Sequence, residues 1–183
     1  MGDEIAEAAA RRRVELAAAG DHDAWEQIYR AVYPRLRAYV ARQVNADVVE
    51  DIVSETMTRA VSGIGGYRWE PAGIDPWLFG IARRVVVDHH RTSGRTRRNA
   101  LAERIPVPAP EPGDALVHED ERTTVRAAFE RLAPADRELL ELRVIGGLSA
   151  EEVAATLGKR AGTIRTAQSR ALARLRAIMD TPL

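Results

Sequence analysis

The sequence predicts an all-α protein of two small helical domains joined by a proline-rich acidic linker. Apolar residues recur at three- and four-residue steps through most of the 183 residues, and this spacing is typical of one face of a helix. Four prolines stand at every second position from Pro106 to Pro112, which predicts an extended segment. The predicted boundaries are residues 1–98 for the first domain, 99–120 for the flexible linker and 121–183 for the second domain, with each domain folding on its own.

Three helices are predicted in the first domain. Asp21 or Asp23 can cap the first, glycines after Gly63 end the second, and Asp75 with Pro76 begins the third. The residues expected to face the core are Trp25, Ile28, Tyr29, Val32, Leu36, Tyr39 and Val40 in the first helix, Val49, Ile52, Val53, Met57, Ala60, Val61 and Ile64 in the second, and Trp77, Leu78, Ile81, Ala82 and Val85 in the third.

The second domain is again predicted to be helical. Pro134 and Asp136 open one helix, and Ser149 with Glu152 three residues later forms a capping box for the next. The inward residues of the last helix, from about Thr163 to Met179, are expected to be Ile164, Ala171, Leu172, Leu175 and Ile178.

Residues 150–169 fit a helix-turn-helix. Val153 and Leu157 are apolar on its first helix, and Gly158 falls where the turn needs a positive φ. The second helix would lie in the major groove of DNA. Its outward positions would be Thr163, Arg165, Thr166, Ser169 and Arg170. A plain helical hairpin is the alternative, but it explains the glycine less well.

Opposite charges are segregated along a chain whose formal net charge is zero. Residues 83–104 hold seven arginines against two acidic residues, and residues 159–176 hold six basic residues and no acidic one. Residues 47–55 and 111–121 are acidic. The basic segments suit contact with phosphates and the acidic helix suits a basic partner, although any one of them could simply solvate a helix face.

The composition disfavours several classes of protein. The chain has no cysteine, which excludes disulfides and thiolate metal sites. Its histidines show no i, i+4 pair, and no phosphate loop or nucleophile elbow is present, so we expect no metal, no cofactor and no enzyme activity. No apolar run reaches the ~20 residues of a membrane helix and no signal-peptide pattern begins the chain, so we expect a cytoplasmic protein.

Three segments resemble bacterial RNA polymerase sigma factors of the extracytoplasmic-function (ECF) type. Region 4 of that family is similar to residues 132–166, LAPADRELLELRVIGGLSAEEVAATLGKRAGTIRT. Region 2.2 is similar to residues 47–61, DVVEDIVSETMTRAV, and regions 2.3 and 2.4 to residues 76–91, PWLFGIARRVVVDHHR. The segments follow the family order, and the resemblance implies a transcription initiation factor without an active site.

The resemblance also implies where the partners bind. Region 2.2 would dock on the β′ clamp helices of core RNA polymerase through Asp47, Glu50, Asp51, Ser54 and Glu55. Region 4 would contact the β flap and bind the −35 promoter element through Lys159, Arg160, Thr163, Arg165, Thr166, Ser169 and Arg170. The linker would either thread through the polymerase or serve as a tether.

The −10 promoter element would be melted and held by a loop and the helix after it. The residues implied are Tyr67, Arg68, Trp69, Arg83, Arg84, Asp88 and Arg91. Aromatic rings can stack on separated bases, but core packing is an equally good explanation for Tyr67 and Trp69. We also expect a monomer when the chain is free, and an anti-sigma factor as a further partner.

Some positions depart from the family pattern. Arg84, Ser54 and Met57 replace a common asparagine, glutamine and phenylalanine, Lys159 replaces an apolar residue, and Ala167–Gln168 replaces an Arg-Leu pair. These departures bear on promoter sequence rather than on fold. A free-standing helix-turn-helix regulator with an N-terminal sensing or dimerisation domain is the other interpretation of the sequence, and it would bind a palindromic operator without polymerase.

Overall fold

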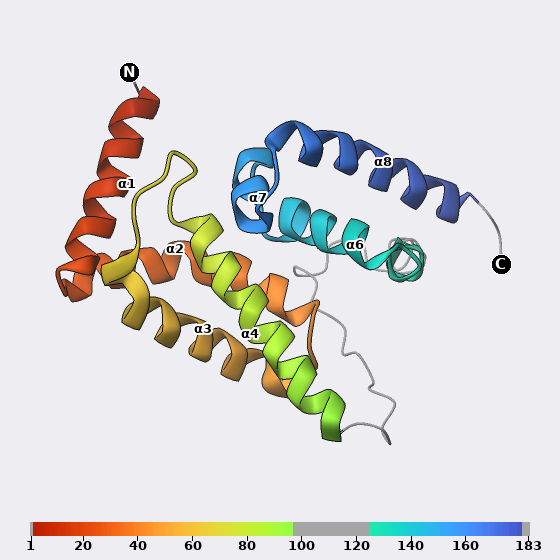
Figure 1. Cartoon of the computed structure of the whole chain (residues 1–183), viewed down its shortest axis with the longest axis horizontal. Coiled ribbons are helices and arrows are strands. Elements are labelled where there is room, and N and C mark those ends of the chain that lie inside the picture. Colours follow the sequence, from red (N-terminus) through yellow and green to blue (C-terminus); the bar gives the residue numbers. More distant parts are fainter. Residues whose placement is uncertain (1, 97–124, 181–183) are drawn as a thin grey trace, which may run out of the picture.

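The structure is a computed structural model that describes residues 2–96 and 125–180, and these residues form helices and connecting turns (Figure 1). The helices are α1 (Gly2–Ala18), α2 (His22–Ala41), α3 (Val49–Gly63), α4 (Asp75–Thr96), α6 (Pro134–Leu140), α7 (Ala150–Leu157) and α8 (Ala161–Met179), and residues 125–130 are helical as well. Short turns complete the list: 3₁₀ turns at Ala46–Val48 and Ile64–Gly66 and a π-helical turn at Glu141–Ile145. The predicted all-α fold is confirmed.

Helices α2, α3 and α4 pack into a bundle around large side chains with almost no exposure. Leu36, Tyr39 and Val40 come from α2, and Leu78 and Phe79 come from α4. Tyr39 and Phe79 meet edge to face, with ring centroids 5.5 Å apart. Three independent helices therefore share one apolar centre.

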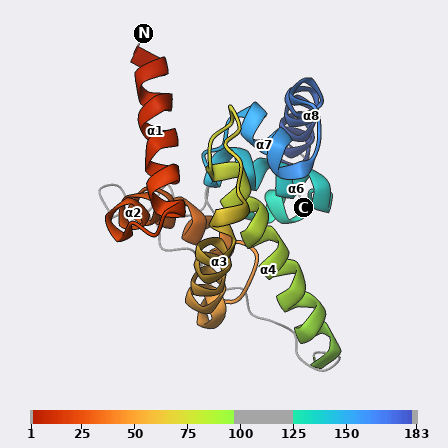
Figure 2. The same cartoon turned by 60° about the vertical axis from the view of Figure 1, so that its left-hand side comes forward.

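The ends of α2 and α3 lie where the sequence predicts them. Asp21 is the N-cap of α2, and its carboxylate accepts a hydrogen bond from the Ala24 backbone N–H at 2.9 Å. Helix α3 ends at Gly63. Helix α1 was not predicted, and it projects from the bundle (Figure 2). Among the α1 side chains whose burial the structure describes, only Val14 and Ala17, near its C-terminal end, are buried.

The C-terminal helices wrap a smaller centre. Leu139 and Leu140 of α6, Leu142 of the π-helical turn, Val153 of α7 and Ile164 of α8 are all buried. Helix α8 packs on both α6 and α7. These contacts hold α8 along one edge of the molecule (Figure 1).

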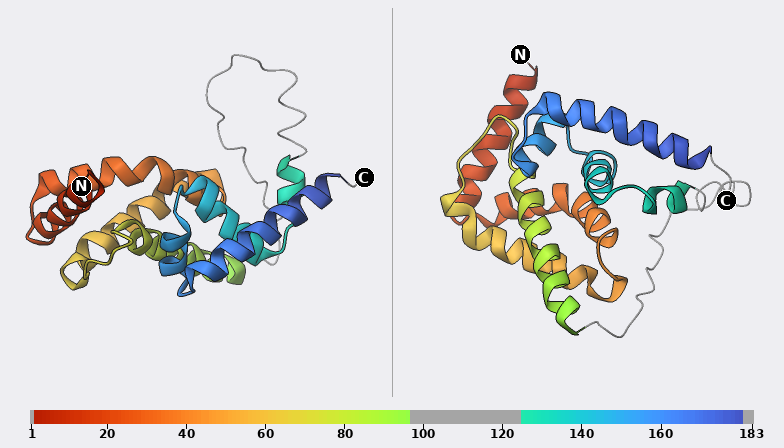
Figure 3. Two further views of the ribbon diagram at one scale, coloured as in Figure 1. Left: turned by 90° about the horizontal axis from the view of Figure 1, so that it is seen from above. Right: turned by 45° about the vertical axis from the view of Figure 1, so that its right-hand side comes forward.

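The two helical parts lie against each other in this structure. Helix α7 packs on α4, and the π-helical turn packs on α2 (Figures 1 and 3). Buried apolar residues of both parts form one continuous cluster, which differs from the expectation of two separately packed modules. The reason is the apolar surface of α4: Phe79 lies beside Gly146, where an added Cβ would stand 2.9 Å from the Phe79 ring. The predicted linker, 99–120, lies outside the described residues, and the domain boundaries stay a prediction.

Three of the predicted core residues are exposed. Tyr29, Val61 and Leu172 expose 39%, 52% and 40% of their surface. Each stands at the edge of an apolar stripe whose centre is buried. The periodic pattern therefore identifies the buried face of each helix correctly but overestimates how many residues of that face are buried.

No helix within residues 2–96 or 125–180 combines the length and apolar character that a membrane span requires.

Phe79 offers a test of the contact between the two parts. Phe79→Ala removes a ring with no exposed surface from between Tyr39 and Gly146, and we expect it to lower the free energy of unfolding by about 3–4 kcal/mol. Val61→Ala, at an exposed position, should change it by less than about 0.5 kcal/mol. Urea denaturation followed by circular dichroism measures both, and equal losses in the two variants would contradict the packing described.

Candidate nucleic-acid interface

Helices α7 and α8 form a helix-turn-helix whose ends are fixed by local chemistry. Ser149 Oγ accepts from the Glu152 backbone N–H at 3.1 Å, and the Glu152 carboxylate accepts from the Ser149 N–H, which completes the predicted capping box. Gly158 ends α7 with φ of 64°, in the left-handed region that favours glycine. The turn between the two helices is therefore built as the spacing predicts.

Helix α8 is anchored by one face only. Ile164 and Ala171 have no exposed surface, while Leu175 and Ile178 are half-buried on the same side. The opposite face is open to solvent, and α8 carries no acidic residue along its length. A helix held this way can enter a groove with its outer face free.

All seven residues predicted to bind the −35 element are exposed in the structure. They are Lys159, Arg160, Thr163, Arg165, Thr166, Ser169 and Arg170. Thr163, Thr166 and Arg170 line one shallow groove on α8 together with Asp136 of α6. The structure thus brings three of the seven side chains to one groove.

Acidic residues of neighbouring helices pair with arginines of α8. Arg165 pairs with Glu151 of α7, and Arg174 donates to Asp136 at 2.5 Å. Both arginines are more than half exposed, so these ion pairs contribute little to stability. Their effect is to restrict where the two guanidinium groups lie on the exposed side of α8.

The acidic face predicted to bind polymerase lies on α3 and the turn before it. Its residues Asp47, Glu50, Asp51, Ser54 and Glu55 are all exposed. Two of its carboxylates already have cationic partners: Arg37 donates to Glu50 at 2.6 Å, and Arg59 donates to Glu55 at 2.7 Å. Considering only the residues that the structure describes, Asp47 and Asp51 therefore carry the least compensated charge of this face.

Glu50 is held by two residues of α2. Arg37 and the Tyr33 hydroxyl, the latter at 3.0 Å, both donate to its carboxylate. These two bonds keep the pKa of Glu50 below its usual value, the Arg37 bond having the larger effect. Glu50 therefore stays ionised at the edge of the face.

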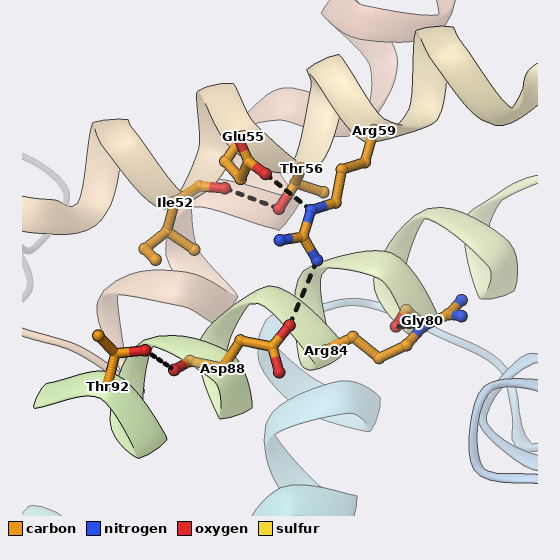
Figure 4. Close-up of polar contacts among 8 residues, drawn as sticks. All are labelled: Ile52, Glu55, Thr56, Arg59, Gly80, Arg84, Asp88 and Thr92. Atoms are coloured by element: carbon orange, nitrogen blue, oxygen red, sulfur yellow. Dashed lines mark hydrogen bonds and ion pairs between the residues drawn. The ribbon is translucent and has the colours of Figure 1, made fainter. Parts of the chain in front are cut away.

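Arg59 joins the acidic face to the helix predicted to bind the −10 element. Figure 4 shows its guanidinium between Glu55 on its own helix and Asp88 on α4, the second contact being 3.4 Å. Arg59 is not among the residues predicted from the sequence to bind a partner. The i, i+4 spacing from Glu55 could have predicted the first contact, but nothing local predicts the second.

The aromatic residues of the loop before α4 face inward. The Tyr67 hydroxyl donates to the Gly73 carbonyl at 2.8 Å, and the Tyr67 ring lies 5.1 Å from that of Trp77. Burial raises the pKa of the Tyr67 hydroxyl. Trp69 is half-buried against the core. Packing thus accounts for most of the surface of both aromatic residues.

Four of the charged residues predicted to bind the −10 element are exposed and one is half-buried. Arg68, Arg84, Asp88 and Arg91 are exposed. The Arg84 Nε donates to the Gly80 carbonyl on its own helix at 3.0 Å (Figure 4). Arg83 is half-buried and donates to Glu138 of α6 at 2.5 Å. This bond raises the pKa of Arg83, which was in any case ionised.

One groove gathers part of the predicted −10 set. Tyr67, Arg68 and Arg84 line it together with Ala155 and Thr156 of α7. Trp69 does not line this groove, and Asp88 and Arg91 lie further along α4. The structure therefore brings three of the seven residues to one place.

Among the residues that the structure describes, no three histidine, aspartate or glutamate side chains are grouped so that they could hold a metal ion.

Comparison with known proteins identifies the two helical parts. A family model described as Sigma-70 region 2 matches residues 28–96, and one described as Sigma-70, region 4 matches residues 122–175. The chain is 33% identical over 168 residues to the ECF RNA polymerase sigma factor SigD of Mycobacterium tuberculosis, covering 87% of this chain and 79% of SigD. It is 32% identical over 162 residues to BldN, an ECF RNA polymerase sigma factor of Streptomyces coelicolor, of which it spans 61%.

Solved structures agree with this assignment. CnrH, in complex with the cytosolic domain of CnrY, shares the fold with a TM-score of 0.70 at 23% identity, covering 94% of this chain and 97% of CnrH. The sigma factor RpoE of Bartonella quintana, in complex with the anti-sigma factor NepR, gives 0.67 at 26% identity, covering 86% and 98%. Matches to regions 2 and 4 in this order define a sigma factor of the sigma-70 class. The chain belongs to the ECF RNA polymerase sigma factors.

The turn before α8 can be tested with two glycines. Gly158→Ala forces an L side chain into the left-handed region although nothing blocks its Cβ, so it should lower stability by ~1–2 kcal/mol. Gly162→Ala, within the first turn of α8 and equally unobstructed, should instead raise stability by ~0.5–1 kcal/mol. Thermal unfolding of the full chain measures both changes in stability. If Gly162→Ala lowered stability as much as Gly158→Ala, the assignment of Gly158 to the turn and of Gly162 to α8 would be wrong.

Proposed function

We propose that this chain binds core RNA polymerase and directs it to promoters by holding two DNA elements, acting as a binding factor with no reaction of its own. The observation that supports this most strongly is that all seven predicted −35 residues are exposed, five of them on the acid-free helix α8 and two, Lys159 and Arg160, in the turn before it. The family to which the chain belongs implies the same activity.

The −35 element would be bound as duplex DNA. The N-terminal half of α8 enters the major groove, where Arg165 and Arg170 reach guanine edges or phosphates and Thr163 and Thr166 supply hydroxyl donors. The pairing of Arg165 with Glu151 keeps its guanidinium near this face until DNA replaces the carboxylate.

The −10 element would be held by the groove at the start of α4. Arg68 and Arg84 are exposed cations at its rim and suit the phosphates of a separated strand. Tyr67 forms part of its wall. We assign Trp69 to packing rather than to base stacking, because it is half-buried and lies outside the groove.

The acidic face of α3 would dock on a basic surface of the polymerase β′ subunit. Asp47 and Asp51 steer the encounter because neither carboxylate forms an ion pair within residues 2–96 and 125–180. Polymerase binding then holds both DNA modules at a fixed spacing, which raises their joint affinity without new contacts.

An inhibitor is a further proposed partner. CnrH was solved with the cytosolic domain of CnrY and RpoE with the anti-sigma factor NepR. We propose that this chain binds a protein of the same kind.

Run-off transcription tests the proposed function. The chain with core enzyme should yield promoter-dependent transcripts from a broad promoter library, and core enzyme alone should not. The absence of any chain-dependent transcript across that library would overturn the proposal.

Charge reversal tests the polymerase contact. Asp51→Lys with Glu55→Lys should weaken binding to core polymerase at least about tenfold, or ~1.4 kcal/mol, because like charges then meet. Both residues are exposed, so the melting curve should stay close to that of the native chain. Glu26→Lys with Asp23→Lys on α2 is the matched control, and unchanged affinity in the α3 variant would remove that face from the interface.

Arg165→Ala tests the −35 contact. If Arg165 contacts a phosphate, the slope of log affinity against log salt should fall by about one; if it contacts a base, discrimination at one −35 position should fall by ~1–3 kcal/mol. The measurement uses the complex with polymerase on promoter DNA. Arg30→Ala, an exposed arginine of α2, should change neither quantity. A variant indistinguishable from this control would exclude Arg165 from the DNA contact.

A further inference from the structure

The guanidinium of Arg59 lies between two carboxylates that belong to different helices. Its Nε donates to Glu55, one turn earlier on α3, at 2.7 Å, and its Nη1 donates to Asp88 of α4 at 3.4 Å (Figure 4). The bond to Glu55 is the shorter one and has the i, i+4 spacing that favours such pairs within a helix. Glu55 therefore fixes the direction of the Arg59 side chain, and Asp88 meets a cation that is already oriented.

Asp88 uses only one of its carboxylate oxygens in this contact. Arg59 reaches Oδ2, and within residues 2–96 and 125–180 it is the only cation that pairs with Asp88. The other oxygen, Oδ1, accepts no hydrogen bond from those residues and points away from the guanidinium in Figure 4. Because the Asp88 side chain is exposed, Oδ1 is open to a donor from another molecule.

Arginines stand on either side of Asp88 along α4. Arg84 lies four residues before it and Arg91 three residues after it, so the three share one exposed face of the helix. The Arg84 Nε donates to the Gly80 carbonyl rather than to Asp88. A face with these arginines suits the phosphates of DNA. A carboxylate at its centre opposes that attraction, so its place on the face calls for a contact of another kind.

A carboxylate discriminates between bases because it can only accept hydrogen bonds. At the major-groove edge of a base pair, adenine and cytosine present an exocyclic amino group that donates to it, whereas guanine O6 and thymine O4 are acceptors and are repelled. Such discrimination requires an acceptor that is held to within about 0.5 Å by its own partners. An aspartate alone on an exposed helix face turns about its side-chain bonds. The contact with Arg59 restricts that rotation.

We propose that Arg59 is a positioning residue for promoter recognition: it holds one oxygen of Asp88 so that the other accepts a hydrogen bond from the exocyclic amino group of adenine or cytosine in a base pair of the −10 element. This inference rests on the proposed function and names the chemical group that Asp88 contacts. Asp88 lies along α4 beyond the groove assigned to the separated strand, where paired DNA would adjoin it. The guanidinium also offsets the repulsion between Asp88 and the flanking phosphates.

The Arg59–Asp88 pair is better suited to positioning than to holding the fold together. The two side chains are 44% and 52% exposed, and exposed ion pairs contribute little to stability. Helices α3 and α4 pack on each other, and both contribute buried apolar residues to the core. Loss of the Arg59 side chain should therefore leave α4 in place and change mainly the orientation of the Asp88 carboxylate.

A barcoded promoter library, randomised across the −10 element and transcribed by core RNA polymerase with saturating full-length chain, tests this role. Each base preference is a ratio within one sample, so it does not depend on how tightly a variant binds polymerase. At one position the native chain should prefer one base pair about tenfold. Asp88→Ala and Arg59→Ala should each lower that preference at least about threefold, and the double variant should lose no more than Asp88→Ala alone. Arg30→Ala, whose ion pair with Glu26 stays within α2, is the matched control and should keep the preference.

Base analogues at the same position test which chemical group is contacted. Purine in place of adenine, or pyrimidin-2-one in place of cytosine, removes the exocyclic amino group. The analogue also weakens base pairing, so its effect on the native chain is compared with its effect on the Asp88→Ala chain. Relative to that variant, the native chain should lose about tenfold in transcription, and Arg59→Ala should lose less than the native chain.

Two results would overturn the inference. One is an Arg59→Ala chain with native base preferences, even if its melting temperature falls, because Arg59 would then only brace α3 against α4. The other is an analogue that affects the native and Asp88→Ala chains equally. Failure of the proposed function is seen separately, as the absence of any transcript from the native chain with polymerase.

Discussion

Helix α4 has to satisfy two demands at once, and the rest of the molecule is arranged around it. Its inner face buries Leu78, Phe79 and Ala82 completely, and these residues join α2 and α3 to the C-terminal helices. Its outer positions carry Arg84, Asp88 and Arg91 to solvent. Because the helix is held by apolar contact on one side, its charged side can change partners without loss of the fold.

The distribution of charge over the surface of this protein is more informative than its net charge. The formal net charge is zero, yet α8 is purely basic while the face of α3 is acidic. Most of the arginines nearest these faces are already paired within the chain, as Arg37 and Arg59 are on one side and Arg165 and Arg174 on the other. Such pairs are weak in water, so a partner with a better matched charge can exchange with them.

Local chemistry explains what the sequence could predict. Asp21, the Ser149–Glu152 box and Gly158 act within a few residues, so their patterns alone locate the start of α2 and both ends of α7. The acidic face of α3 and the exposed face of α8 follow from helical periodicity once the ends are known. Tyr29, Val61 and Leu172 were wrongly placed inside because periodicity does not say how far a neighbouring helix reaches across a stripe.

Contacts between distant residues could not be predicted in the same way. Gln43 and Glu141 are 98 positions apart, and Arg83 and Glu138 are 55 apart. No local pattern marks these residues as partners, and the contacts exist only because the C-terminal helices pack against α4 and the end of α2. Arg59 likewise reaches Asp88 only through the crossing of α3 and α4. The sequence predicts the helices, but how the helices pack against one another determines which charged residues form ion pairs.

The one-sided anchoring of α8 has an evolutionary consequence. Ile164 and Ala171 are buried and secure the helix, while the residues of the other face are exposed: Thr163, Arg165, Thr166, Ser169 and Arg170. Substitution among those five positions is nearly free of folding cost. If this face binds DNA as proposed, lineages can acquire new target sequences by drift on it while the scaffold stays constant, and diverged copies of one gene can come to serve separate sets of genes.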